Sequence, residues 1–285
     1  MHKHLTILAG ATLAALLAGP ALAADWSDTS LGYRYGTQFA EPFNSQDIKK
    51  NIFSLTHASG YKYGSNFLNV DMLLSDSKDP ANVGTSNGAH EVYIVYRHTL
   101  DLGKVSGRTL AFGPVRGVGL TAGFDFNTKN DAGYNSKKRM GVLGPTLMFD
   151  VPGFLNASLL LLKESNAPYN SFTNNSTPRY TYKTHPMLNL AWGIPLGDTG
   201  LSFEGYANFI ASKGKNEFGG GTAPETNIDA QVMYDLSPTL GAAKGTFKLG
   251  FEYQYWRNKF GNPHSGPAGD GAFAKTPMIR GEYHF

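Results

Sequence analysis

The chain has 285 residues and no cysteine, and beyond its first 23 residues it has no long apolar run. The missing thiols exclude a disulfide scaffold and any thiolate metal site. A membrane-spanning helix needs about 20 consecutive apolar residues, so we expect no such helix in the rest of the chain. An excess of one charge is lacking as well, because 25 Lys and Arg residues oppose 22 Asp and Glu residues. This balance gives no reason to expect nucleic acid as a partner.

Catalytic motifs are also missing. The sequence contains no Gly-x-Ser-x-Gly, no His-Glu-x-x-His and no phosphate-binding glycine loop. Its eight histidines are scattered without the spacing of metal ligands. We therefore expect a protein that is not an enzyme and that uses neither a cofactor nor a metal.

The first 23 residues predict export. An apolar run from Leu5 to Leu17 follows Lys3, and Ala21-Leu22-Ala23 fits the small-x-small rule for cleavage. We expect a secretory signal peptide over 1–23 and a mature chain over 24–285. The alternative is a retained membrane helix, which the short run and its ending at Gly19-Pro20 disfavour. Without Lys3 the mature chain carries a formal charge of +2, from 24 basic and 22 acidic residues.

The full sequence contains 34 Gly, 18 Phe and 15 Tyr residues, and beyond residue 23 its apolar residues alternate with polar ones. Such alternation is typical of β-strands. We count twelve alternating segments and no linker between domains, so we predict a single all-β domain over 24–285. The segments cover residues 30–38, 50–58, 65–75, 89–100, 116–128, 138–151, 154–164, 180–194, 201–211, 227–236, 247–256 and 277–285.

The connections between these segments alternate in length. Longer polar connections are expected near 38–49, 76–88, 128–137, 165–179, 212–226 and 258–275. Shorter ones are expected near 59–64, 101–112, 151–153, 195–200 and 237–245. Outer-membrane barrels have short periplasmic turns and long external loops. The pattern therefore predicts a transmembrane antiparallel up-and-down β-barrel of about twelve strands, with both termini in the periplasm.

One face of each segment is apolar and the other carries charges. In the third segment Leu68, Val70 and Met72 share one face, while Phe67 and Asp71 share the other. Burying one unpaired charge in a dry interior costs several kcal/mol, so this many inward charges require partners or water. A water-lined lumen satisfies them most simply. The alternative is a closed plug of paired charges that does not conduct.

Mixed aromatic and ionisable side chains on the inward faces suit a solute with a flat ring and hydroxyl groups. For each aromatic residue alone, ordinary filling of the interior is the competing interpretation. The candidates for lining the pore and binding solute are Phe67, Asp71, Glu91, Tyr93, Arg97, Asp125, Glu204, Tyr206, Glu252, Trp256 and Arg280.

The stretch around the second turn resembles a known family. The pattern His57-x-x-Gly60-x-x-Tyr63-Gly64-x-Asn66-Phe67-x-x-Val70-Asp71 is similar to that of the Tsx-type nucleoside-specific channels of the Gram-negative outer membrane. The resemblance implies a narrow, monomeric barrel for passive diffusion of nucleosides. It also implies external loops that phages or toxins can use. The N-terminal region departs from the family, because it lacks an aromatic-rich start beyond Trp26 and the pair Tyr33 and Tyr35. Which solute is preferred therefore stays open.

The C-terminus gives a second indication, after the signal peptide, of where the protein goes. Ile279, Tyr283 and Phe285 alternate, and the last residue is Phe285. This ending resembles the signal by which the barrel-assembly machinery recognises outer-membrane proteins. We therefore expect outer-membrane lipids, the barrel-assembly machinery and nucleoside-like solutes as partners.

Three other functions stay open at this point. A general small-solute porin and a non-conducting structural or adhesive barrel have the same sequence pattern. Membrane-embedded hydrolases of twelve strands also exist, and His98, predicted to face lipid, is the residue that keeps this alternative open.

Overall fold

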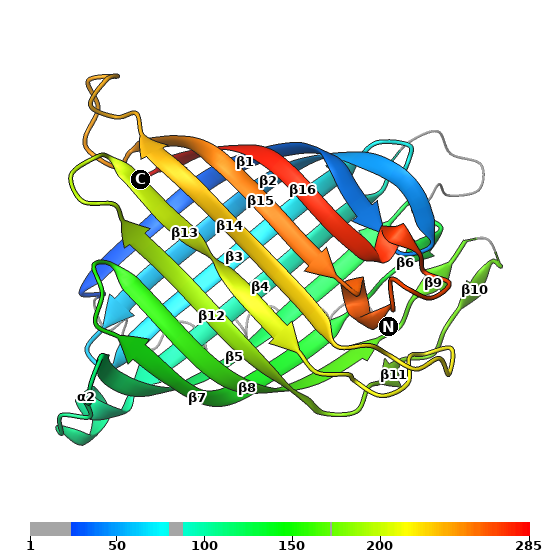
Figure 1. Ribbon diagram of the computed structural model, residues 1–285, viewed down its shortest axis with the longest axis horizontal. Helices are drawn as coiled ribbons and strands as arrows, with labels where there is room; N and C mark the ends of the chain where they lie inside the picture. The colour runs from blue at the N-terminus through cyan, green and yellow to red at the C-terminus, as the bar shows by residue number, and fades with distance from the viewer. Residues whose placement is uncertain (1–23, 80–87, 172) are drawn as a thin grey trace, which may run out of the picture.

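The computed structural model describes residues 24–79, 88–171 and 173–285, in which twelve long strands form a closed antiparallel barrel (Figure 1). The predicted antiparallel barrel of about twelve strands is confirmed. The barrel strands are β1 (Trp26–Glu41), β2 (Asn44–Tyr61), β3 (Gly64–Ser75), β4 (His90–Asp101), β5 (Val115–Asn130), β7 (Arg139–Phe149), β8 (Phe154–Asn166), β12 (His185–Pro195), β13 (Leu201–Ile210), β14 (Glu225–Asp235), β15 (Phe247–Arg257) and β16 (Phe273–His284).

Each barrel strand pairs with the next one along the chain, and the last strand closes the ring. β16 pairs with β1 in a register that runs from Ser30↔His284 to Gly36↔Met278. Closure leaves no sheet edge with unpaired backbone groups, which an open sheet has to cover in some other way.

The barrel wall is apolar outside and polar inside. On β15 the outward side chains of Leu249 and Phe251 are 52% and 75% exposed. The next residue, Glu252, points inward and is 2% exposed. Soluble monomers rarely expose so continuous an apolar surface, and a lipid-facing surface consists of such residues.

The leucine run on β8 shows how the alternation decides the secondary structure. Leu159 and Leu161 are 57% and 59% exposed, while Leu160 and Leu162 are each 1% exposed. Four consecutive leucines could also suit a helix, but only a strand sends neighbouring side chains to opposite faces.

The connections lie at the two ends of the barrel (Figure 1). We name the end with the small sheet and the η helices the loop end, and the end with α2 the turn end. At the loop end, β6 (Tyr134–Asn135), β9 (Tyr169–Asn170) and β10 (Asn175–Ser176) form a small sheet, and β11 (Tyr180–Thr181) pairs with the end of β8. The short helices η1 (Lys259–Gly261) and η2 (Asp270–Ala272) lie there too.

The turn end carries α2 (Leu102–Ser106) and both ends of the described chain. Asp101 caps α2 by accepting a hydrogen bond from the Lys104 backbone N–H, and Gly107 ends it at a φ of 68°. Trp26 pairs with Gly60 beside the β2–β3 turn, and the Phe285 N–H donates to the Thr29 carbonyl at 2.9 Å. No helix in the described ranges is long and apolar enough to cross a membrane.

One predicted connection is wrong. Residues 38–49 do not form a long loop, because β1 continues to Glu41 and β2 begins at Asn44. Phe39 pairs with Ile48 across the two strands, and both side chains are buried in a small cluster with Met278. The polar residues around them concealed this alternation. Two register shifts in β1 mark bulges near Phe39, and such bulges interrupt the period of two.

Candidate functional site: the barrel lumen

The barrel encloses a cavity of about 720 Å³. Alternate residues of nearly every barrel strand reach it, because successive side chains of a strand point to opposite faces. Of the predicted pore-lining residues, the following border the cavity: Phe67, Asp71, Glu91, Tyr93, Arg97, Asp125, Glu204, Tyr206, Trp256 and Arg280.

Glu252 does not border the cavity. It faces inward, but its side chain is fully buried beneath two arginines. Arg34 donates to one of its carboxylate oxygens at 3.1 Å, and Arg280 donates to the other at 2.7 Å. Glu252 therefore holds these arginines in place, and it does not offer its own carboxylate to a solute.

The arginines of the lumen are all paired with carboxylates. The Arg34 guanidinium lies 2.5 Å from Asp71, and Arg280 lies 2.6 Å from Glu282. Arg97 is paired with Asp125, which also accepts a hydrogen bond from the Tyr93 hydroxyl at 3.0 Å. Each of these three arginines therefore has at least one carboxylate that balances its charge.

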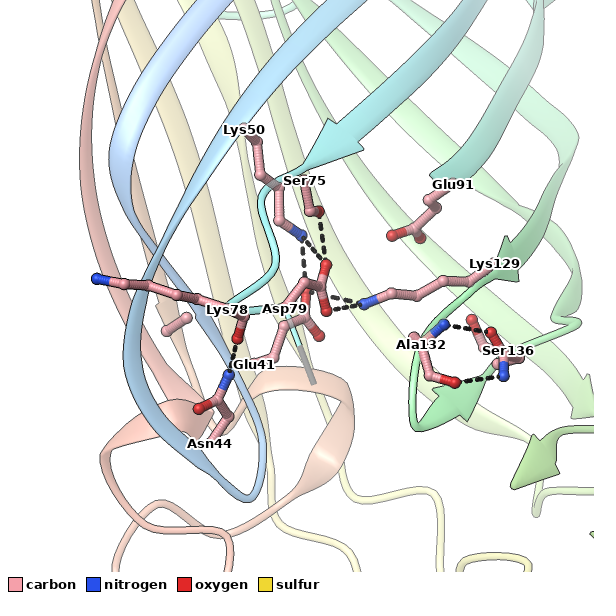
Figure 2. Close-up of polar contacts among 12 residues, drawn as sticks. Glu41, Asn44, Lys50, Ser75, Lys78, Asp79, Glu91, Lys129, Ala132 and Ser136 are labelled. Atoms are coloured by element: carbon pink, nitrogen blue, oxygen red, sulfur yellow. Dashed lines mark hydrogen bonds and ion pairs between the residues drawn. The ribbon is translucent and has the colours of Figure 1, made fainter. Parts of the chain in front are cut away.

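A second set of charges lies at the loop end, and we name Glu41, Lys50, Asp79, Lys129 and Lys259 the lysine cluster. Figure 2 shows Lys50 and Lys129 reaching from β2 and β5 to Asp79, at 3.5 and 2.7 Å. Lys50 and Lys259 also donate to Glu41, at 2.8 and 3.2 Å. Asp79 is fully buried and Lys50 is 2% exposed. The cluster ties β1, β2, β5 and η1 to the segment that follows β3.

The helix η1 turns into the lumen. Phe260 borders the cavity, although it lies in a segment predicted as an external loop. Asn258 and Phe260 have φ of 54° and 60°, a left-handed conformation that is costly for a bulky side chain. The Phe260 ring packs edge-on against Trp256 at 4.8 Å, and the Lys138 ammonium lies 3.9 Å from its centroid. Sequence reasoning missed Phe260, because nothing in its neighbourhood alternates.

The predicted aromatic residues differ in how free their rings are. Trp256 donates its indole N–H to Glu225 at 2.8 Å and lies beneath the Lys259 ammonium. Phe67 has no ring partner among the described aromatic side chains, and it is 40% exposed although it borders the cavity. Phe67 therefore offers an open ring face, whereas Trp256 is fixed between neighbouring side chains.

Two tyrosines at the loop end keep their hydroxyl protons. Glu217 accepts hydrogen bonds from the hydroxyls of Tyr134 and, at 2.5 Å, Tyr182. Burial raises the pKa of both phenols well above the usual value, and the negative charge of Glu217 raises each pKa further. Both tyrosines therefore act as uncharged donors at any physiological pH.

His98, the residue on which the hydrolase alternative depends, has a partner at each ring nitrogen. His98 contacts Asn66 through Nδ1 at 2.8 Å and the Tyr61 hydroxyl through Nε2 at 3.2 Å. Both ring nitrogens thus have partners, and neither partner is a serine. The described ranges also contain no group of His, Asp and Glu that could hold a metal ion.

Comparisons with known proteins find similar barrels among solved structures. No family model and no curated protein matches the sequence. The KdgM porin is 9% identical, with a TM-score of 0.43 over 90% of this chain and 99% of that one. The translocator domain of the autotransporter NalP from Neisseria meningitidis is 15% identical, with a TM-score of 0.47 over 98% and 96%. The TodX deltaS2S3 mutant monoaromatic hydrocarbon channel is 9% identical, with a TM-score of 0.38 over 95% and 93%. Likeness at this level carries no argument about solute or partner, so the fold assignment rests on the strand register.

Proposed function

We propose that the protein is an outer-membrane channel for passive diffusion of nucleosides or similar small solutes. The observation that carries this proposal is the exposed ring of Phe67 inside a lumen of about 720 Å³ whose arginines are paired with carboxylates. A ring face stacks on a planar base, and the polar groups around it hydrogen-bond to hydroxyls. Paired charges favour an uncharged solute.

The proposed contacts follow from how accessible each group is. Phe67 and Tyr206 offer ring faces. Asp71, Arg97 and Glu204 are ion-paired, but their side chains remain 17%, 21% and 24% exposed at the cavity wall, so each can still contact a solute. Trp256, Tyr93 and Glu91 border the cavity with their polar groups already engaged, so we assign them to shaping it. Asp125, Glu252 and Arg280 keep the charged groups in position through their ion pairs.

The orientation in the membrane is part of the proposal. The termini of the described chain lie at the turn end, which we assign to the periplasm; the loop end then faces outward, where a phage or toxin could bind. Export by the predicted signal peptide over 1–23, assembly through Phe285 and a monomeric state complete this picture. Since each barrel closes on itself, it needs no second copy to pair its edges.

Planar-bilayer recording of the purified full chain tests the function. We expect single-channel currents that nucleosides block at lower concentrations than sugars of similar size. Equal effects of nucleosides and sugars would indicate a general small-solute porin. The absence of any current would indicate the structural or adhesive barrel, with the lysine cluster and η1 closing the loop end.

A further inference from the structure

Three asparagines lie side by side on the lumen wall. Asn189 on β12 pairs in register with Asn208 on β13, which pairs with Asn227 on β14. Directly paired positions place their Cβ atoms about 4.5–5.5 Å apart. All three side chains border the cavity. We name these residues the asparagine row. Its next register position, on β15, is Trp256.

The asparagine row has hydrogen-bonding capacity that the protein does not use. Asn189 donates to Asn208 at 2.7 Å, and Asn227 reaches only the Tyr206 hydroxyl, at 3.5 Å. The Asn227 side-chain oxygen is buried and has no partner among the described residues, although the whole residue is only 8% exposed. Leaving a buried acceptor unsatisfied costs stability, and native structures contain few such groups.

The spare groups alternate along the row. The oxygen of Asn189, the nitrogen of Asn208 and the oxygen of Asn227 are left over after the internal bonds are made. Each asparagine carries two amide donors and an acceptor oxygen, so a row of three presents both kinds of group whichever way an individual amide is turned. A row of this kind complements a ligand edge on which N–H and C=O groups stand side by side.

We propose that the asparagine row binds the amide or imide edge of a planar ring, the edge at which ring N–H and C=O groups adjoin. This inference rests on the proposed passage of nucleosides and specifies which part of the solute the channel recognises. The row is uncharged and Trp256 at its end is held by Glu225, so the site suits a neutral flat ring. A buried polar group that only the correct solute satisfies is an effective source of specificity.

Current block of the full-length channel tests the row, with uridine and 3-methyluridine as the first pair of solutes. Methylation removes the ring N–H and leaves the ribose and the ring size in place. We expect uridine to bind about tenfold more tightly than 3-methyluridine, because 3-methyluridine leaves a hydrogen-bonding group of the buried site unmatched. In Asn208→Leu this ratio should fall to about one, through loss of the amide.

Asn69→Leu is the matched control, because Asn69 also borders the cavity but lies on β3, outside the row. It should keep the tenfold ratio, about the wild-type preference. If Asn208→Leu does not give a folded barrel, Asn208→Asp replaces it, since it removes the N–H donors without changing the shape. An unchanged ratio in the Asn208 variant, or an equal loss in Asn69→Leu, would overturn the inference.

A second pair of solutes separates this inference from the proposed function. Glutarimide carries the imide edge without a sugar, and N-methylglutarimide lacks the ring N–H. If uridine does not block the wild-type channel but glutarimide does, and its N-methyl form does not, the nucleoside function fails and the row stands. If uridine and 3-methyluridine block equally well, the nucleoside function stands and the row fails.

Discussion

The lysine cluster and the asparagine row are two ways of placing polar side chains inside one barrel. In the lysine cluster every charge has a partner of opposite sign, and Asp79 is completely buried between Lys50 and Lys129. In the asparagine row no group is charged, and the oxygen of Asn227 has no partner within the described part of the chain. Groups that satisfy one another stabilise the protein and have little to offer a solute. Groups left unsatisfied contribute less to stability and are available for recognition.

The largest expected effect comes from breaking the lysine cluster at Asp79. In Asp79→Asn the ammonium groups of Lys50 and Lys129 keep their buried positions but lose a carboxylate. Removing one partner of a buried ion pair costs about 3–5 kcal/mol. We expect urea unfolding of the barrel in lipid vesicles to show a loss of this size.

Asp198→Asn is the control for this measurement, because Asp198 is exposed in the β12–β13 turn. Surface substitutions of this kind change stability by about 0.5 kcal/mol or less. A loss in Asp79→Asn no larger than that of the control would mean that the cluster does not stabilise the loop end.

The next effect concerns the inward helix η1. Phe260→Ala removes the ring that packs against Trp256 and lies beneath Lys138. Loss of an aromatic pair and a cation–π contact costs about 1–3 kcal/mol. We expect a larger single-channel conductance, since the ring leaves the lumen. Phe218→Ala, at an exposed loop position, should leave conductance unchanged, and equal conductance in the two variants would contradict this role for η1.

A smaller effect is expected from the arginine pairs. Arg97→Gln leaves the carboxylate of Asp125 with Tyr93 as its hydrogen-bond donor and adds one net negative charge to the lumen. We expect the reversal potential in a salt gradient to shift towards cation selectivity. Arg116→Gln is the control, since Arg116 is exposed at the turn end and donates to the Phe149 carbonyl. A shift of the same size in both variants would mean that the lumen charge does not set selectivity.

The sequence predicted the strands well because alternation is a local property. The exception is the run from Leu159 to Leu162, which is too brief for its period to decide between a helix and a strand. The error at 38–49 arose because bulges near Phe39 interrupt the period of two. Such interruptions leave the presence of a strand predictable, but they hide the residue at which the strand ends.

The candidate site was less predictable, because it depends on register. Asn189, Asn208 and Asn227 become neighbours only when three strands pair in one particular alignment, and a shift of one residue would send an asparagine to the outer face. The burial of Glu252 likewise depends on Arg34 and Arg280, which approach it from β1 and β16. The inward turn of Phe260 has no periodic signal at all.

The smallest effect on stability is expected at Asn227, the residue of the asparagine row that differs most from the lysine cluster. In Asn227→Leu a side chain of similar shape replaces an amide that the described residues leave nearly unsatisfied. Its oxygen has no partner among them, and its nitrogen reaches the Tyr206 hydroxyl at 3.5 Å. Removing an unsatisfied polar group relieves a desolvation cost, so the free energy of unfolding should change by about 1 kcal/mol or less. Discrimination between uridine and 3-methyluridine should nevertheless be lost. Urea unfolding and current block on the same preparation measure the two quantities together. A stability loss as large as that of Asp79→Asn would mean that Asn227 stabilises the barrel as the residues of the lysine cluster do. The distinction between satisfied groups that stabilise and unsatisfied groups that recognise a solute would then fail.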